Sequence, residues 1–154
     1  MKDKLNSLKS ITARKINADD SVTFSLLDNR TNFPVVVSTN YRDINISGWM
    51  QNNRASIDSK LRDSGAILFR GFGVNSIEKF QLFMTYFGSD VLEYKLRSSP
   101  RHSVGDKVYV STKYPSEYSI NMHSESSYSP LHPRKIVFCC IEQADEDGET
   151  PIAD

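Results

Sequence analysis

The triplet His123-Ser124-Glu125 places an imidazole and a carboxylate two positions apart. On an extended strand, residues i and i+2 point to the same side, so both side chains could bind one metal ion in adjacent positions. With a second histidine they would form the 2-His-1-carboxylate set of non-haem Fe(II) sites, which leaves positions open for a cosubstrate and dioxygen. Because the 154 residues include 19 acids, this spacing also arises by chance, and the triplet alone does not identify a site.

The same triplet could begin a zinc deaminase signature, in which His-x-Glu is followed by Pro-Cys-x-x-Cys. The two cysteines, Cys139 and Cys140, are adjacent and no proline precedes them, which argues against that signature. A disulfide between neighbours on a strand would be strained, so we expect a reducing compartment. We interpret the pair as two small buried strand residues and not as reactive thiols. A metal-binding barrel of the cupin type ranks last, because the chain has only three histidines.

A glycine turn, Gly71-Phe-Gly73, resembles the start of a dinucleotide fingerprint, in which backbone amides at a helix N-terminus hold a pyrophosphate. The third glycine of that fingerprint is replaced by Ser76, and a polar, charged stretch, 93–100, stands where a second parallel strand should follow. The sequence therefore favours a glycine turn with a helix cap over nucleotide binding.

Several short apolar segments are expected to position these residues. Residues 1–32 are polar and predict an irregular region with one short strand, Val22–Leu26. The run Phe33–Ser38 is β-branched, and Pro34 near its start predicts an edge strand. Buried strands are expected at Ala66–Arg70 and, from its continuous apolar character, at Lys135–Gln143. The Tyr- and Ser-rich stretch 109–129 is interpreted as ordered loop and short strand forming a pocket wall.

Helices are expected in two places. Ile57 and Leu61 have i, i+4 spacing within a helix over Trp49–Leu61. A second helix begins at Asn75 as the N-cap and ends at Gly88. Asp147-Gly148 predicts a chain reversal. Together the elements predict a mainly β protein with flanking helices, of the α+β class, with antiparallel strands rather than alternating βαβ units.

The amino-acid composition argues against several classes of binding partner. The 19 basic and 19 acidic residues give zero net charge and no basic block, which argues against nucleic acid and anionic membranes as partners. No apolar run reaches the roughly 18 to 20 residues of a membrane span, so a cytoplasmic protein is expected. A length of 154 residues suits one domain, although a hydrophobic fraction of 38% and a mean hydropathy of -0.45 are low for one.

Longer stretches resemble the taurine dioxygenase (TauD/TfdA) family of Fe(II)- and 2-oxoglutarate-dependent oxygenases. Within that family the chain is most similar to the branch found beside peptide-synthetase assembly lines, which includes the syringomycin-pathway hydroxylase. The resemblance covers residues 60–154 well and the first 60 loosely. The stretches that carry it are 65–72, 97–101, 108–130, 133–138 and 148–154.

The resemblance implies an oxidoreductase that hydroxylates an amino acid or a carrier-bound aminoacyl group, with Fe(II), 2-oxoglutarate and dioxygen. It makes His123 and Glu125 the first two iron ligands, with no catalytic residue beyond the metal ligands. Thr150 would help to hold the 2-oxoglutarate carboxylate. His102 and His132 are interpreted as structural or surface residues.

The family's fold is a double-stranded β-helix, or jelly roll, and its distal iron-ligand histidine and cosubstrate-binding arginine would lie beyond residue 154. We therefore expect residues 1–60 to form an irregular N-terminal region with an edge strand and a short helix. Residues 61–154 would be the N-terminal part of a dioxygenase jelly roll whose C-terminal half is absent. The chain alone should then lack turnover. The alternative is a non-catalytic remnant, or a split-gene subunit that requires a partner chain.

Overall fold

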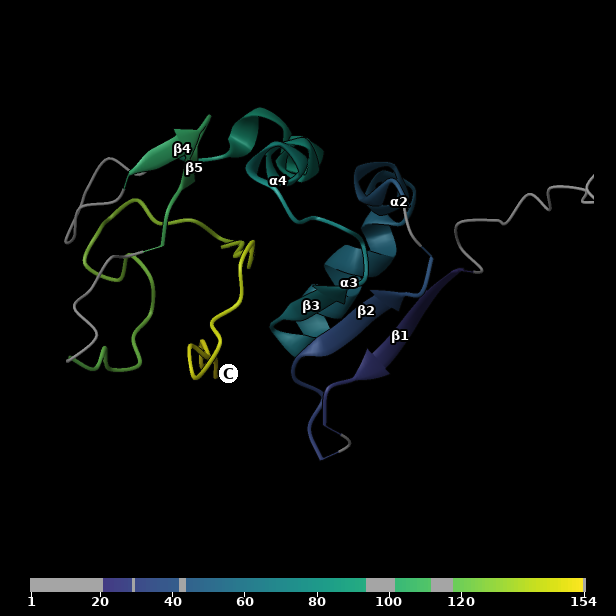
Figure 1. Cartoon of the computed structure of the whole chain (residues 1–154), viewed down its shortest axis with the longest axis horizontal. Helices are drawn as coiled ribbons and strands as arrows, with labels where there is room; N and C mark the ends of the chain where they lie inside the picture. The colour runs from purple at the N-terminus through teal and green to yellow at the C-terminus, as the bar shows by residue number, and fades with distance from the viewer. Residues whose placement is uncertain (1–20, 29, 42–43, 94–101, 112–117, 154) are drawn as a thin grey trace, which may run out of the picture.

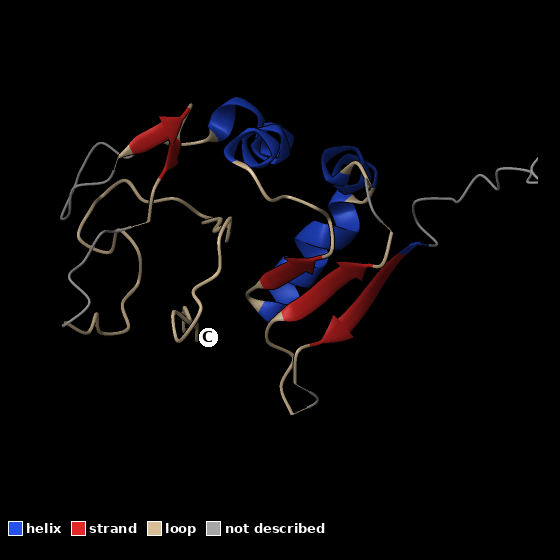
Figure 2. Cartoon of the chain, viewed as in Figure 1, coloured by secondary structure: helices blue, strands red, loops and turns tan. Residues whose placement is uncertain are grey.

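The computed structural model describes residues 21–28, 30–41, 44–93, 102–111 and 118–153. In this part of the chain, three α-helices accompany a three-stranded and a two-stranded sheet (Figure 1, Figure 2). The α+β class expected from the sequence is thus confirmed, although the helices hold more residues than the strands. The segments 1–20, 97–101 and 112–117, on which some expectations rest, lie outside the described residues.

The larger sheet has the strand order β1-β2-β3. The expected strand β1, Val22–Leu26, pairs antiparallel with β2, Val35–Thr39. On its other side β2 pairs in parallel with β3, Ile67–Arg70. The expectation that this second segment is an edge strand is therefore wrong, since β2 is central. Pro34 is tolerated because it precedes the first paired residue, so its missing N–H removes no hydrogen bond from the ladder.

The parallel pairing of β2 with β3 needs a crossover, and two helices provide it. This corrects the expectation of purely antiparallel strands. The single helix expected over 49–61 is also two helices, α2 (Ile46–Asn52) and α3 (Arg54–Ser64), which meet at Asn53. Helix α2 starts where the Asn45 side chain accepts a hydrogen bond from the Gly48 amide at 3.1 Å.

Helix α4, Ile77–Met84, follows β3. Its N-cap is Ser76, whose hydroxyl accepts from the Lys79 amide at 3.3 Å, and not Asn75 as expected. The Asn75 side chain instead accepts from the Lys79 ammonium group at 3.0 Å. The α-helix ends at Met84, before the expected Gly88, and continues as the 3-10 helix η2, Thr85–Asp90.

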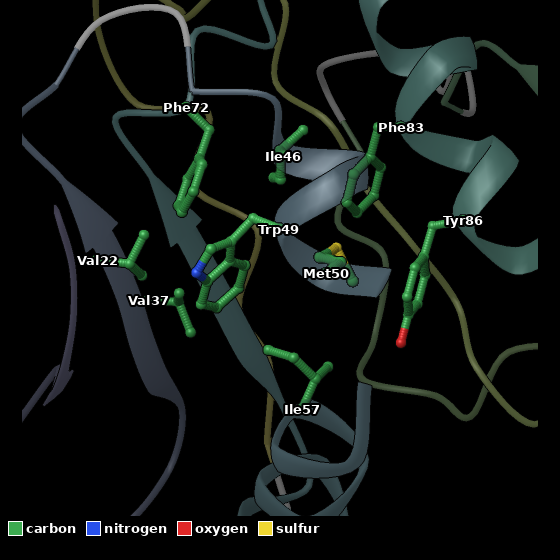
Figure 3. Close-up of a cluster of buried hydrophobic side chains, with 9 residues drawn as sticks. All are labelled: Val22, Val37, Ile46, Trp49, Met50, Ile57, Phe72, Phe83 and Tyr86. Carbon is green, nitrogen blue, oxygen red and sulfur yellow. The ribbon is translucent and has the colours of Figure 1, made fainter. Parts of the chain in front are cut away.

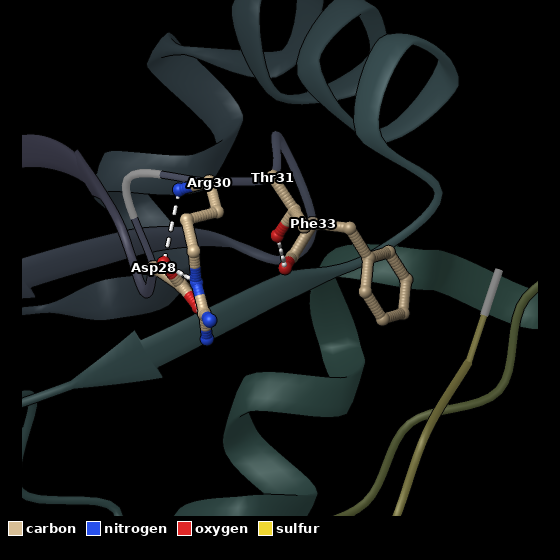
Figure 4. Close-up of polar contacts among 4 residues, drawn as sticks. All are labelled: Asp28, Arg30, Thr31 and Phe33. Atoms are coloured by element: carbon tan, nitrogen blue, oxygen red, sulfur yellow. Dashed lines mark hydrogen bonds and ion pairs between the residues drawn. The ribbon is translucent and has the colours of Figure 1, made fainter.

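The β1–β2 connection is held by local polar contacts (Figure 4). Arg30 donates to Asp28 through its guanidinium, with Nη2 2.6 Å from the carboxylate, and this contact lowers the pKa of Asp28. The Thr31 hydroxyl donates to the Phe33 carbonyl at 2.9 Å. Because water reaches Asp28 and Arg30, this contact should define the shape of the turn but contribute little to the free energy of unfolding.

The core lies between the sheet and the helices (Figure 3). Trp49 of α2 packs against Phe72, which follows β3, with ring centroids 6.0 Å apart. Val37 of the central strand is fully buried, and Met50 is 2% exposed. These contacts fix α2 against the sheet. The buried cluster consists of Val22, Val37, Ile46, Trp49, Met50, Ile57, Phe72, Phe83 and Tyr86.

The remainder of the described chain is mostly irregular. Strand β4, Ser103–Gly105, pairs antiparallel with β5, Val108–Tyr109. The buried strand expected at Lys135–Gln143 is wrong, because that segment has no strand pairing and is largely exposed. Asp147 and Gly148 have positive φ angles of 55° and 84°, as an Asp-Gly reversal requires, but the assigned bend lies just before them, at residues 145–146. None of the described helices is both long and apolar enough to cross a membrane.

Candidate metal site

His123 lies on irregular backbone, and Glu125 is the first residue of a tight double turn that follows it. The Ser127 amide donates to the Ser124 carbonyl at 3.3 Å, and the Ser129 amide donates to the Ser126 carbonyl at 2.9 Å. Ser126 has a positive φ of 60°, a conformation uncommon for residues other than glycine. The pair is therefore presented by a turn and not by the strand that the i, i+2 argument assumed.

The two side chains nevertheless approach each other. His123 Nε2 lies 3.8 Å from Glu125 Oε2, and the side chains are 58% and 21% exposed respectively. On the other side of the ring, His123 Nδ1 lies 2.8 Å from the Asn121 carbonyl oxygen. A carbonyl oxygen can only accept, so in the neutral ring Nδ1 carries the proton and donates it. Nε2 is then left with its lone pair on the side of the carboxylate.

This arrangement presents one imidazole nitrogen and one carboxylate oxygen side by side. Both are ligands for divalent transition metals, and a backbone carbonyl that receives the other ring N–H is the usual means of fixing a metal-binding histidine. In the part of the chain that the structure describes, no group of three His, Cys, Asp or Glu residues is close enough to hold a metal ion. Among the described residues, the pair could thus supply two metal ligands but not a complete set.

The other residues singled out by the sequence are exposed to solvent. Thr150 lies on irregular chain two residues after Gly148. His102 and His132 are both exposed, in agreement with their interpretation as surface residues. Sequence reasoning missed Asn121, because it acts through its backbone carbonyl and no side-chain pattern signals such a role.

The two cysteines differ in environment, which corrects their interpretation as a buried pair. Cys139 is half-buried, and its thiol lies 3.7 Å from the Val74 carbonyl. Burial raises the pKa of the Cys139 thiol above its ordinary value, with a smaller contribution from Cys140. Cys140 is exposed, and neither cysteine forms a disulfide.

The glycine turn after β3 has a structural reason. Gly71 has a φ of 84°, and a Cβ atom there would lie 2.1 Å from the Thr39 carbonyl oxygen. Gly73 also has a positive φ, of 67°. The glycines thus allow the chain to pass close to the end of β2 before α4 begins, which supports the interpretation as a turn and not as a phosphate cradle.

The chain is similar in sequence to proteins of one known family. The family model described as "Taurine catabolism dioxygenase TauD, TfdA family" matches residues 29–154. Dapdiamide synthesis protein DdaC of Enterobacter agglomerans is 40% identical over 98 residues, which are 64% of this chain and 30% of DdaC. A clavaminate synthase-like protein of Arabidopsis thaliana is 40% identical over 96 residues, 62% of this chain and 29% of the relative. The matched stretch thus spans less than a third of either relative.

Proposed function

This chain belongs to the taurine catabolism dioxygenase (TauD, TfdA) family, and on that premise we propose that it works in an Fe(II)- and 2-oxoglutarate-dependent dioxygenase. His123 and Glu125 would be two of the iron ligands. Bound iron, with 2-oxoglutarate and dioxygen, would supply the oxidising chemistry that hydroxylates a C–H bond.

One observation carries the proposal for this chain's own residues. The His123 Nε2 and Glu125 Oε2 atoms are 3.8 Å apart, while Nδ1 is held by the Asn121 carbonyl at 2.8 Å. The imidazole therefore needs no change of tautomer to bind through Nε2, and the donor set of one nitrogen and one carboxylate fits Fe(II). The role of the Asn121 carbonyl is to orient the ring.

Two features complete the proposal. A facial triad requires a second histidine, which would come from polypeptide other than these 154 residues, since the chain's other two histidines are exposed and interpreted as surface residues. The hydroxyl of Thr150 would hydrogen-bond the 2-oxoglutarate carboxylate once the segment after Gly148 is placed beside the pair. We further propose that the intact domain has the jelly-roll fold of the family, with residues 61–154 in its N-terminal part.

The proposed substrate is an amino acid or a carrier-bound aminoacyl group, acted on in the cytoplasm. The support for this substrate is the resemblance to the branch associated with peptide synthetases, together with the DdaC relative, whose name assigns it to dapdiamide synthesis.

Metal binding by the purified chain tests the ligand assignment directly. Calorimetric titration with Co(II), an air-stable substitute for Fe(II), should show weak binding, which His123→Ala and Glu125→Ala each reduce by about tenfold or more. The matched control is His132→Ala, which removes an exposed histidine from the same irregular part of the chain. Equal loss in the control, or unchanged affinity in His123→Ala, would refute the assignment.

Activity should depend on a complete ligand set. With Fe(II), 2-oxoglutarate and dioxygen, the 154-residue chain alone should form no succinate, because two protein ligands hold iron poorly. Succinate formation by the purified chain that is abolished in His123→Ala would show that the pair suffices.

A further inference from the structure

A cavity of about 480 Å³ lies between the β1–β2 connection and the C-terminal end of α3. That volume is within the range of small-molecule sites in proteins. The connection contributes Thr31 and Phe33, which Figure 4 shows, together with Asn32. The helix contributes Asp63 and Ser64, its last two residues. None of these five residues belongs to the candidate metal site, so the proposed function leaves the cavity unexplained.

The two hydroxyl groups of the cavity wall can accept hydrogen bonds but have no proton left to donate. The Thr31 hydroxyl donates to the Phe33 carbonyl at 2.9 Å. The Ser64 hydroxyl, on a side chain that is 6% exposed, lies 2.7 Å from the Lys60 carbonyl and 2.9 Å from the Ala66 carbonyl. A hydroxyl has one proton and two lone pairs, so both oxygens remain open to a donor. The wall therefore favours a ligand that brings hydrogen-bond donors.

Asp63 adds a negative charge that forms no ion pair with any described residue. The Ser59 hydroxyl donates to its Oδ2 at 3.3 Å, which leaves Oδ1 to accept from a ligand. The acid also stands at the C-terminal end of α3, where the helix dipole favours a cation and disfavours an anion. A residue that breaks such a local rule without a compensating partner is expected at a functional site.

Two basic side chains near the cavity wall in the sequence are held elsewhere. The Arg30 guanidinium donates to Asp28 through Nε at 2.8 Å and Nη2 at 2.6 Å. The Lys60 ammonium group lies 4.4 Å from the centre of the Phe24 ring. The described residues that line the cavity include no Lys or Arg. The charge of Asp63 is therefore available to a cation from outside the chain.

We propose that this cavity binds a primary ammonium group carried on a short alkyl chain. An ammonium group has a positive charge and three N–H donors, which match the open oxygens of Asp63, Thr31 and Ser64. The Phe33 ring offers apolar surface to the alkyl chain. A carboxylate on the ligand weakens binding, because no basic side chain of the wall receives it. The site goes beyond the proposed function and uses neither of its metal ligands.

Titration of the isotope-labelled 154-residue chain with pentylamine, followed by amide NMR spectra without added metal, tests this proposal. The amide signals of Thr31, Phe33 and Ser64 should shift and saturate. Asp63→Asn should weaken binding by about tenfold or more, because a neutral acceptor replaces a charged one. The matched control is Asp106→Asn, which removes the same charge from the exposed turn between β4 and β5 and should bind like the wild type.

Stability separates a binding role of Asp63 from a structural one. Without amine, Asp63→Asn should unfold in urea at the wild-type midpoint or above it, because the variant removes an acid from the negative end of α3. Saturating pentylamine should raise the midpoint of the wild type and not that of Asp63→Asn. A variant that unfolds below the wild type without amine would show that Asp63 serves the fold, which would overturn the proposal.

Three other ligands define what the cavity recognises. Pentanol has the same chain without the charge and should bind at least about tenfold more weakly than pentylamine. Aminopentanoate adds a carboxylate and should also bind more weakly. Nα-acetyl-lysine amide carries the same ammonium group: tighter binding than pentylamine would assign the site to a peptide lysine, and equal or weaker binding to a free amine.

The proposal is overturned if pentanol binds as well as pentylamine, if Asp63→Asn and Asp106→Asn bind alike, or if no amide of residues 31–33 and 63–64 shifts. His123→Ala should bind pentylamine like the wild type, because it changes only the metal pair. Failure of amine binding would therefore leave the metal assignment standing, and failure of the metal assignment would leave the amine site standing.

Discussion

The hydroxyl of Tyr86 is buried in the core without a hydrogen-bond partner among the described residues, and we predict that Tyr86→Phe stabilises the fold. The residue is 9% exposed, and its ring packs edge-on against Phe87 at 5.0 Å with Arg54 over its face at 5.9 Å. Phenylalanine keeps the ring contacts and removes only the hydroxyl. An unsatisfied buried donor costs about 1 to 3 kcal/mol, so the variant should gain up to that amount.

The expected gain corresponds to about 2 to 4 °C in melting temperature per kcal/mol for a chain of this size. Urea unfolding followed by tryptophan fluorescence is a direct assay, because Trp49 is the chain's one tryptophan and belongs to the same core. Tyr41→Phe is the matched control, since Tyr41 is 45% exposed, and it should change stability by less than about 0.5 kcal/mol.

The pH dependence gives a second readout. Burial, and then the charge of Asp58, raise the pKa of Tyr86 above its ordinary value. Above about pH 10 the unfolded chain loses this proton while the folded chain keeps it, so wild-type stability falls as pH rises. The advantage of Tyr86→Phe should therefore widen above pH 10. A variant less stable than wild type by more than about 0.5 kcal/mol would refute the reasoning, because the hydroxyl would then have a stabilising partner.

Three further predictions follow from the turns and contacts that position the helices. Gly71→Ala should cost at least about 2 kcal/mol in urea unfolding, because a Cβ would lie 2.1 Å from the Thr39 carbonyl in addition to the strain of positive φ. Gly73→Ala, with nothing within 4 Å, should cost only about 1 to 2 kcal/mol, and equal costs would contradict the close approach. Ser76→Ala should lower stability by about 1 kcal/mol through loss of the α4 cap, and Asn75→Ala by clearly less; the reverse order would restore Asn75 as the cap. Lys135 lowers the pKa of Asp58, so this partly exposed pair contributes at most about 1 kcal/mol above pH 4 and less as pH falls through the pKa of Asp58. Asp58→Asn should reduce that acid dependence in a urea series from pH 3 to 7, and an unchanged dependence would show that other carboxylates cause it.

Local sequence signals predicted where strands lie along the chain better than which strands lie beside them in the sheet. The strand at 22–26 and the β-branched run that became β2 were visible from composition, but Pro34 suggested an edge strand. The proline lies one residue before the ladder, so it carries no information about which strands flank β2. The parallel pairing with β3 depends on a crossover through two helices, which no local pattern encodes.

In the candidate site, too, the sequence predicted the residues but not the backbone conformation that brings them together. The spacing of His123 and Glu125 was readable as a metal-ligand pair, but the strand assumed to align them is a turn with Ser126 at positive φ. The proximity of 3.8 Å therefore arises from a conformation that the i, i+2 rule does not describe. The contact of the imidazole with the Asn121 carbonyl could not be predicted from residue types, because every residue has a backbone carbonyl.

The incorrect prediction of a strand at Lys135–Gln143 has a physical cause. Apolar character along a segment measures how much surface it must bury, whereas strand pairing requires a second segment to receive the backbone hydrogen bonds. Here Val137 packs against the core and Cys139 is half-buried, whereas the residues that alternate with them are exposed, so the alternation is present without strand pairing to any described residue. The predicted alternation of side chains was correct, and the predicted pairing with another strand was not. A segment with one face on the core and no strand beside it keeps the strand pattern in its side chains alone, so that pattern does not by itself show that a ladder has formed.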